Sequence, residues 1–433
     1  MCRYHTIRSS WLFQSEINLI LKLNNREKIT IFKFKNHFML LRFKFKNSRS
    51  FADETRFSML ASKISGPPFN VAELEGSKCL KSTKVLKSAI ICGANASGKS
   101  SFLISLKSAV SLIKDSHKFP PGEGMPHAPF KSSAKKGEES SFEFEFVADK
   151  VRYKYLFSHN AERIGKESLI AYPKGRPQEW FSRQRETAGA YSWRFGKSLK
   201  KEKSAAKLTV ENVLLLSQAA VSYAPKLREI YNWFAKSFQT FTSCEPGKNT
   251  DIGECIAGAD TAQLIKFLKI AYPDISRIEI KKNAYKAPSD VLFHHANLSE
   301  PIPCAEEASG VAALARLWIA ATRAIDCGGI FIADTPESNL HTLLLMEIIK
   351  LFNSRENKSG AQFIFTSHNH ALLSQEIFRR DQIWFCEKNG RGESEIYPLS
   401  KFNVRKDLSI RKAYVSGLFG ALPKLCEELG ETN

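Results

Sequence analysis

Apolar and polar residues alternate at the start of the structured part of the chain. In "MLLRFKFKNSRSF", residues 39–51, Leu41, Phe43 and Phe45 alternate with basic residues, which is the two-residue period of a half-buried strand. The stretch 140–157, "SSFEFEFVADKVRYKYLF", alternates on both sides of a short polar break and predicts an antiparallel hairpin. Together these patterns predict an antiparallel β subdomain.

Continuous apolar runs alternate with helical patterns near both ends of the chain. Residues 89–92 are apolar and lead into a glycine-rich loop, after which Phe102 and Leu106 lie on the apolar side of a predicted helix. A second helix is predicted from Gly310, and three apolar strands follow it at 330–333, 363–366 and 383–386. This order predicts an α/β core that carries a large insertion.

The middle of the chain has weaker patterns. Residues 182–207 hold eight basic and two acidic residues, with Tyr191, Trp193 and Phe195 between them, and are expected to form an exposed loop or lid. Residues 208–270 have a mostly helical pattern, and "SRIEIKKNAYKAPSDVLFHHA" predicts a second strand pair.

Four segments follow from these patterns. Residues 1–38 lack clean periodicity and are interpreted as a disordered leader or an over-extended gene start. Residues 39–157 are expected to be an amino-terminal lobe with the β subdomain. Residues 158–300 are expected to be a largely helical insertion with the basic lid, and residues 301–433 a carboxyl-terminal lobe.

Composition narrows the class of protein. The 433 residues are 43% hydrophobic and 25% charged, as in a soluble globular protein, and no apolar run is long enough to span a membrane. The nine cysteines include no C-x-x-C pair, which argues against a zinc ribbon or a disulfide framework and favours a cytoplasmic location. The net charge of +20 favours contact with a polyanion, although solvated lysines account for part of it.

The glycine-rich loop "GANASGKS" has the spacing G-x-x-x-x-G-K-[ST] and lies where a phosphate-binding loop must, between a buried strand and a helix. Its glycines let successive backbone N–H groups face a phosphate, and the helix amino terminus adds partial positive charge. Lys99 is expected to bridge the β- and γ-phosphates of ATP, and the Ser100 hydroxyl to bind Mg²⁺. The predicted nucleotide-binding residues of the loop are Gly93, Ala94, Asn95, Ala96, Ser97, Gly98, Lys99 and Ser100.

Two later residues complete the predicted site. Asp334 closes the strand "IFIA" and is the expected second holder of Mg²⁺. His368, in "FIFTSHNH", ends the neighbouring strand, from which it could reach the γ-phosphate or the attacking water.

The order of these motifs, with "EEASG" before a helix, "IADTPESNLH" and "FIFTSHNHALLS", resembles the ABC-type ATPase heads of the SMC/RecF/OLD group. More closely it resembles the AAA-labelled bacterial ATPases of the abortive-infection kind found in phage-defence loci. "RFKFKNSRSF", "NVLLLSQAA" and the tail "RKDLSIRKAYVSGLFGALPKL" extend the resemblance over nearly everything from Met39. It implies a P-loop NTPase fold and a homodimer that clasps two ATP molecules.

The resemblance also implies roles for individual residues. Ser309 and Gly310 would belong to a segment that completes the nucleotide site of a second subunit, and His368 would act as a switch. A loop between the two heads would contain Asn339, Leu340 and His341.

Two positions depart from the resembled pattern. The family sequence D-E-P-E-x-x-L-H is D-T-P-E-S-N-L-H here, so Thr335 replaces the glutamate that polarises the attacking water. Glu337 is the remaining carboxylate, two positions later and after a proline. The serine of the S-x-G segment falls at Ala308 unless Ser309 substitutes for it, and no Q-loop glutamine is evident. A positioned general base contributes about 10²–10⁴ in rate, so its loss is expected to leave hydrolysis slow or impaired. ATP binding is still expected. The candidate catalytic positions are Glu337, His368 and Thr335.

Two functions are therefore compared. The first is a head that dimerises on ATP and controls a partner effector encoded nearby, in anti-phage defence. The second is a DNA- or RNA-binding maintenance ATPase, for which the basic segment 182–207 is the supporting feature. The absence of an LSGGQ-like string disfavours a transporter subunit, and a non-hydrolysing pseudo-ATPase is compatible with either of the first two.

Overall fold

The computed structural model describes residues 38–74, 83–131, 137–187, 189–242, 256, 259–282, 288–405 and 407–423. Contacts divide the described chain into two compact units. The larger comprises the described residues before 244 and those from 320 onward, and the smaller comprises those from 244 to 319. The expected leader, apart from Phe38, lies outside the described residues.

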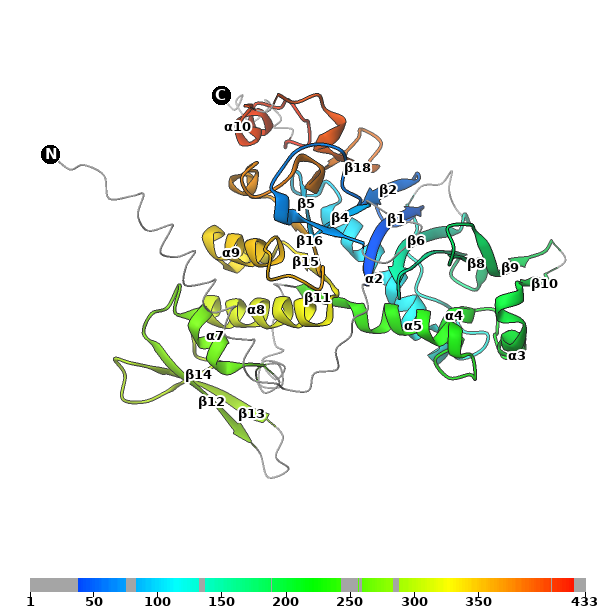
Figure 1. Cartoon of the computed structure of the whole chain (residues 1–433), viewed down its shortest axis with the longest axis horizontal. Coiled ribbons are helices and arrows are strands. Elements are labelled where there is room, and N and C mark those ends of the chain that lie inside the picture. Colours follow the sequence, from blue (N-terminus) through cyan, green and yellow to red (C-terminus); the bar gives the residue numbers. More distant parts are fainter. Residues whose placement is uncertain are drawn as a thin grey trace, which may run out of the picture. The chain divides into compact units, whose positions relative to one another are not determined.

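A six-stranded sheet forms the centre of the larger unit, in the order β11-β15-β16-β5-β17-β18 (Figure 1). All neighbouring pairs are parallel except β17 with β18, which is antiparallel. Parallel order brings the carboxyl ends of β15, β16 and β5 to one edge of the sheet, where loops can meet. The strands are β5 (Ser88–Cys92), β11 (Phe238–Thr242), β15 (Ile330–Asp334), β16 (Gln362–Ser367), β17 (Ile383–Lys388) and β18 (Ser394–Pro398).

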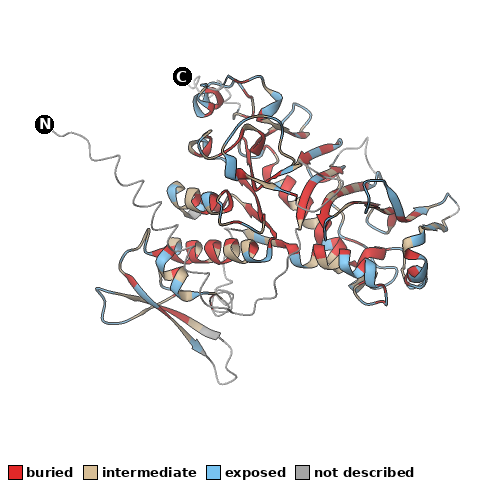
Figure 2. Ribbon diagram, viewed as in Figure 1, coloured by how far each residue is buried: buried red, intermediate tan, exposed pale blue. Residues whose placement is uncertain are grey.

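Alternate side chains of this sheet face different helices, because successive residues of a strand point to opposite faces. Ile332 and Ile364 belong to the core cluster that includes helix α2 (Lys99–Asp115). Phe331 and Phe363 instead stack on Phe352 of helix α9 (Thr342–Phe352), with ring centroids 6.0 and 5.0 Å from it. Figure 2 shows the central strands as buried. Burial on both faces explains why these strands read as continuous apolar runs.

The second large sheet has seven strands, all antiparallel, in the order β10-β9-β8-β7-β6-β1-β2. Helix α2 joins it to the parallel sheet, since Phe102 contacts Phe43, Phe45 and Phe57 with centroid separations of 5.2 to 6.2 Å. The strands are β1 (Met39–Lys46), β2 (Thr55–Ser58), β6 (Ser140–Ala148), β7 (Val151–His159), β8 (Ile164–Tyr172), β9 (Gln178–Arg185) and β10 (Tyr191–Phe195).

Shorter elements complete the larger unit. A two-stranded sheet pairs β3 (Val71–Glu73) with β4 (Lys84–Leu86). The remaining helices are α3 (Lys203–Lys207), α4 (Leu215–Gln218), α5 (Pro225–Ser237) and α10 (Ile410–Val415), with 3-10 segments that include η5 (Lys197–Glu202), η6 (Pro336–Asn339) and η7 (His370–Leu372). Within the described residues, no helix has the length and apolar content to cross a bilayer.

The smaller unit contains an antiparallel sheet and a helix. Strand β12 (Ile275–Lys282) pairs with β13 (Pro288–His295), which pairs with β14 (Ile302–Pro303). Helix α7 (Thr261–Leu268) is capped by Asp260, whose carboxylate accepts hydrogen bonds from the backbone of the first turn. Helix α8 (Ser309–Cys327) begins in this unit, where Phe267 and Trp318 stack at 5.9 Å.

The strands and helices predicted at both ends of the chain are confirmed, as are the hairpin β6–β7 and the pair β12–β13. The loop expected over 182–207 is wrong, because this segment forms the end of β9, then β10, η5 and α3. The insertion at 158–300 is likewise a mixture of strands and helices rather than largely helical. The limits of the four expected domains differ from those of the compact units and remain predictions.

Arg183 explains the error at the edge strands. Its side chain is fully buried, and its guanidinium donates to the carbonyls of Val213 (2.7 Å) and Val210 (3.0 Å). It also lies over the rings of Tyr191 and Trp193, at 4.0 and 5.1 Å from their centroids. The sequence interpretation counted this arginine as surface charge, which concealed the strand alternation.

Candidate functional site

The glycine-rich loop connects the central strand β5 to helix α2. Gly98 caps the helix with φ of 116°, a conformation that favours glycine. A Cβ on Gly98 would lie 2.3 Å from the Ser394 hydroxyl, and one on Gly93 would lie 2.2 Å from the Cys386 carbonyl oxygen. Strands β17 and β18 therefore pass too close to the loop for a side chain at either position.

The Lys99 ammonium is folded back onto the loop. Its Nζ donates to the carbonyl oxygens of Gly93 (2.8 Å) and Ala94 (2.7 Å). Burial lowers the pKa of Lys99, and neighbouring groups that include Asp334 and Glu337 act in the opposite direction. The two carbonyls accept from Lys99 the hydrogen bonds that the phosphate oxygens of a bound nucleotide would accept in their place.

The rest of the loop offers groups to a ligand. Asn95, Ala96 and Ser100 are exposed, whereas Ser97 is buried. The Ser97 hydroxyl has no hydrogen-bond partner among the described residues. A buried polar atom without a partner is unusual in a folded protein, and a phosphate oxygen at this loop would satisfy it. The loop therefore fits the polyphosphate of a nucleotide.

Asp334 lies at the carboxyl end of β15. The Thr366 hydroxyl of the adjacent strand donates to Asp334 Oδ1 at 2.5 Å and fixes the carboxylate at this edge of the sheet. Ser100 is exposed at the start of α2. No group of three or more His, Cys, Asp or Glu side chains in the described chain could hold a metal. One hydroxyl and one carboxylate, with water and phosphate oxygens supplying the other ligands, fit Mg²⁺.

Thr335 occupies a strained backbone position directly after Asp334. Its φ of 46° and ψ of 57° lie in the left-handed region, which β-branched residues rarely adopt. Its N–H donates to the Thr366 hydroxyl at 3.0 Å, and its own hydroxyl lies 3.4 Å from Asp334 Oδ1. The chain reverses sharply here, so the next carboxylate in the sequence returns towards the sheet.

Glu337 is that carboxylate, and it is buried at the end of β16. Its Oε1 accepts from the Ser367 hydroxyl at 2.5 Å and from the backbone N–H of His368 at 3.3 Å. Its Oε2 is buried and has no hydrogen-bond partner among the described residues. The structure therefore gives a direction to Glu337 that the sequence could not supply, towards the backbone of His368 and within electrostatic reach of Lys99.

His368 is exposed just beyond β16. It lines a cavity of about 680 Å³ together with loop residues 93–97, His370, the end of β17 and residues near the carboxyl end. The larger unit thus brings Lys99, Asp334, Glu337 and His368 to one edge of its parallel sheet. The catalytic and binding roles assigned to them remain predictions.

The loop between η6 and α9 contains Leu340 and His341. His341 caps α9, because its Nδ1 accepts from the backbone N–H of Leu343 at 3.3 Å. Leu343 is exposed. The role expected for this loop between two heads also remains a prediction.

Ser309 and Gly310 lie in the smaller unit, at the start of α8. Glu307 accepts from the backbone N–H that follows it and from His295 Nε2, each at 2.8 Å, while His295 Nδ1 contacts Asp274 at 2.8 Å. Burial opposes the charged form of His295, but the hydrogen bonds to Glu307 and Asp274 outweigh it and raise the pKa. Glu307 thus connects the entry of α8 to His295. The action of Ser309 and Gly310 on a second subunit's nucleotide remains a prediction.

The sequence interpretation did not assign residues 414–423 or His370 to the site. Tyr414, Val415 and residues 421–423 form one wall of the 680 Å³ cavity. Their sequence carries one local signal, because the glycines in "YVSGLFGALP" predict sharp turns. Gly417 and Gly420 do adopt positive φ, of 84° and 68°. Nothing local indicates that these turns meet the glycine-rich loop.

Comparison with known proteins gives one family match. The family described as "AAA domain, putative AbiEii toxin, Type IV TA system" matches residues 88–374, which include the glycine-rich loop, Asp334 and His368. No curated protein matches the chain.

Solved structures of SMC heads are similar at a low level. The SMC head domain from Thermotoga maritima aligns with a TM-score of 0.38 and 12% identity, over 83% of this chain and 98% of that chain. An SMC head bound to the C-terminal winged-helix domain of ScpA gives a TM-score of 0.38 and 12% identity over 87% and 99%. An SMC head with an extended coiled coil, bound to the C-terminal domain of ScpA derived from Pyrococcus furiosus, gives 0.37 and 12% over 88% and 98%. These values carry no further conclusion.

Proposed function

Because the chain belongs to the AAA domain family described as putative AbiEii toxin of a type IV TA system, we propose that it is an ATP-binding head whose hydrolysis is slow. The observation that carries the proposal is the buried Lys99 ammonium, held at the centre of a glycine-rich loop with Asp334 and Glu337 within electrostatic reach. This set of groups suits a nucleotide polyphosphate with Mg²⁺. The α/β fold predicted from the sequence agrees with the family and the sheets.

Each group has a distinct task in this proposal. The loop N–H groups and Lys99 bind the phosphates, and Ser100 and Asp334 hold Mg²⁺, which supplies charge neutralisation and orientation when bound. Glu337 keeps one oxygen free of hydrogen bonds and is the candidate acceptor for a proton from water. The backbone N–H of His368 donates to Glu337 Oε1, which links the two residues.

Slow hydrolysis follows from Thr335. Its hydroxyl cannot accept a proton usefully near neutral pH, and it already lies beside the Asp334 carboxylate. ATP binding depends on the loop N–H groups, Lys99 and the metal-holding residues, and is expected to be unaffected by Thr335. The proposed activity is therefore tight MgATP binding with turnover below the usual range of about 1–10³ s⁻¹ for enzymes.

Calorimetric titration of MgATP and a steady-state phosphate-release assay test the proposal together. The wild type is expected to bind MgATP, and Lys99→Ala to lose most of that affinity. Thr335→Glu is expected to raise turnover without changing the dissociation constant much. A wild type that binds no MgATP contradicts the binding proposal. A wild type with ordinary turnover that Thr335→Glu does not change contradicts the proposal of impaired hydrolysis.

We further propose that the cytoplasmic head forms a homodimer on binding ATP and gates a partner effector in anti-phage defence. Ser309 and Gly310 support this, because they begin a 19-residue helix whose amino terminus can face an anion of a second subunit. Sedimentation velocity with MgATP or MgADP tests the dimer. MgATP is expected to double the mass of the wild type and not that of Gly310→Asp. A monomer under saturating MgATP contradicts the proposal.

Nucleic-acid binding is the second candidate function. Five exposed lysines on η5 and α3 support it: Lys197, Lys200, Lys201, Lys203 and Lys207. The aromatic residues between the basic ones do not add to this support, since Tyr191 and Trp193 contact the buried Arg183. Fluorescence anisotropy with a labelled oligonucleotide tests it. Salt-sensitive binding that disappears when these lysines become glutamates would favour this function.

A further inference from the structure

The last described residues of the chain form a short hook against the glycine-rich loop. The hook, defined as residues 409–423, consists of helix α10 followed by a turn with positive φ at Gly417, Gly420 and Ala421. Tyr414, Val415 and residues 421–423 of the hook share a cavity with the first half of the loop.

One backbone hydrogen bond joins the hook to the loop. The Ala94 N–H donates to the Ala421 carbonyl oxygen at 3.0 Å, and the Tyr414 hydroxyl donates to the same oxygen at 3.0 Å. The carbonyl oxygen of Ala94 accepts from Lys99 Nζ at 2.7 Å. Ala94 is therefore held from two sides, by the hook through its N–H and by the phosphate-binding lysine through its carbonyl.

Ring packing holds the hook in place on the parallel sheet. Phe385 of β17 stacks on Tyr414, with centroids 5.3 Å apart and rings 9° from parallel, and on Phe419 at 5.4 Å. The Tyr397 hydroxyl of β18 donates to the Phe419 carbonyl at 2.9 Å. These contacts fix the backbone that leads into Ala421.

Ala421 itself is strained. Its φ of 58° lies in the left-handed region, which costs a residue with a side chain of order 1 kcal/mol and persists only where the surroundings enforce it. This conformation directs the Ala421 carbonyl at the loop. The strain is thus located at the hook residue whose carbonyl accepts the hydrogen bond from the Ala94 N–H.

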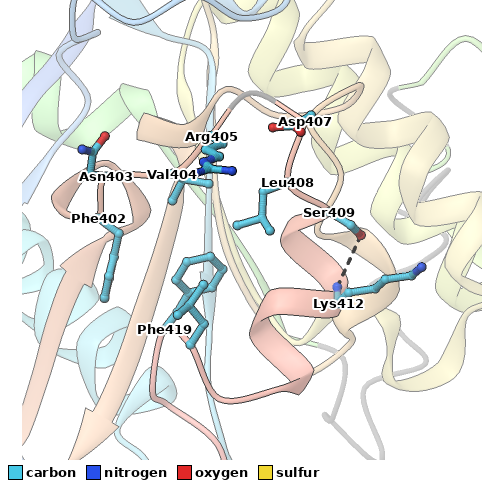
Figure 3. A pocket seen from close by; sticks show the side chains of 10 residues that line it. Phe402, Asn403, Val404, Arg405, Asp407, Leu408, Ser409, Lys412 and Phe419 are labelled. Carbon is cyan, nitrogen blue, oxygen red and sulfur yellow. Dashed lines mark hydrogen bonds between the residues drawn. The ribbon is translucent and has the colours of Figure 1, made fainter.

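A second cavity adjoins the hook on the side of the preceding loop. Its volume is about 580 Å³, and it is lined by Phe402, Leu408, Leu418, Phe419 and the polar residues of the preceding loop (Figure 3). Leu408 and Phe419 face its centre in the close-up view. Phe419 itself is buried and packs on Phe402, with ring centroids 5.3 Å apart. The hook is held towards the glycine-rich loop by the ring contacts and the Ala421 carbonyl.

We propose that the hook is a positioning element of the nucleotide site, which acts through the Ala421 carbonyl on Ala94 and so holds the glycine-rich loop and Lys99 ready for phosphate. The proposal rests on the proposed ATP-binding function. The physical reason is preorganisation, since a loop that is already ordered loses less conformational entropy when the nucleotide binds. The hook acts on the first half of the loop and contacts no catalytic carboxylate. We therefore expect it to affect nucleotide affinity and not the chemical step.

Variants of two residues test this in the full-length protein, with MgATP and MgADP as the titrated ligands. Ala421→Pro forces φ to about −65° and turns the carbonyl away from Ala94. It is expected to lower the affinities for MgATP and MgADP by the same factor, at least 10-fold. The hydrolysis rate at saturating MgATP is expected to stay unchanged. Tyr414→Phe keeps the stack on Phe385 and removes one buried hydrogen bond, for which a loss of about 3- to 10-fold is expected. The conservative Ala421→Gly keeps the carbonyl and relieves the strain, and is expected to bind within about two-fold of wild type.

Tyr155→Phe is the matched control, because it also removes a buried tyrosine hydroxyl bond, that to Glu167 at 2.8 Å in the antiparallel sheet. It is expected to lower stability and leave both affinities unchanged. Wild-type affinity in a folded Ala421→Pro variant overturns the proposal. If that variant does not fold, wild-type affinity in Tyr414→Phe overturns it. If the wild type binds neither MgATP nor MgADP, the proposed ATP-binding function is contradicted. That outcome can be told apart from a failure of the hook proposal, in which the wild type binds and the variants bind equally well.

Discussion

Replacing Glu337 with glutamine tests whether this carboxylate has taken over the task of the glutamate that Thr335 replaces. The side chain is 8% exposed, and Oε1 accepts two hydrogen bonds, from the Ser367 hydroxyl and the His368 N–H. Glutamine has the same shape and can keep both bonds through its carbonyl oxygen. Glutamine places an amide NH₂ group where the unpartnered Oε2 lies, and so removes the one Glu337 oxygen that has no hydrogen-bond partner among the described residues.

The expected changes in hydrolysis rate, affinity and stability follow from these contacts. Loss of a positioned general base lowers the rate by about 10²–10⁴, which corresponds to about 2.7–5.5 kcal/mol of transition-state stabilisation. The affinity for MgATP is expected to stay within about three-fold, because the phosphate-binding groups are unchanged. A buried amide without a partner costs about 1–3 kcal/mol of folding stability.

Single-turnover hydrolysis of radiolabelled ATP by excess protein measures such slow rates, and calorimetry gives the affinity. Thr335→Glu, assayed in parallel, is expected to change the rate in the opposite direction. The assignment of Glu337 is refuted if Glu337→Gln binds MgATP and hydrolyses it at the wild-type rate.

Three further outcomes are expected. Gly98→Ala should abolish MgATP binding in titrations, because its Cβ would lie 2.3 Å from the Ser394 hydroxyl at a φ of 116°; wild-type affinity would contradict this. Glu167→Ala should lower the urea-determined free energy of unfolding by about 3–5 kcal/mol, since it removes a fully buried carboxylate that accepts three hydrogen bonds and takes from the buried Arg183 its carboxylate neighbour. A change below about 1 kcal/mol would argue against a stabilising role. The raised pKa of His295 means that its contribution to stability is present below its unfolded pKa of about 6.5 and is lost as pH rises through the folded pKa. The melting temperature of His295→Gln should therefore fall further below wild type at pH 5.5 than at pH 9, and an equal deficit at both would refute this.

Local sequence determined a large part of the fold. Alternation over residues 39–46 and 140–157 reflects strands with one buried face, and the apolar runs at 330–333 and 363–366 reflect strands buried on both. The glycine-rich loop was equally accessible, because its spacing, strand and helix are all local features. These predictions hold because each depends on residues that are neighbours along the chain.

The sequence interpretation is wrong where tertiary contacts place a residue or segment in an environment that its type does not predict. Arg183 was counted as surface charge, although it is fully buried between backbone carbonyls and two aromatic rings. Strand β11 was missed because its short polar-apolar sequence is decided by pairing with β15, which lies about ninety residues later. Partners at such separations override local propensity.

By itself the sequence determined the spacing of the glycine-rich loop and placed Thr335, not a glutamate, directly after Asp334. From these features it predicted phosphate binding and a metal-side carboxylate at Asp334. Only the tertiary structure decided that Glu337 turns back to Ser367 and His368, and that the Ala421 carbonyl holds the loop at Ala94. The physical reason is that motif spacing specifies which groups follow a strand, whereas their direction depends on backbone turns. Those turns, at Thr335 and Ala421, have positive φ and are enforced by packing from distant strands.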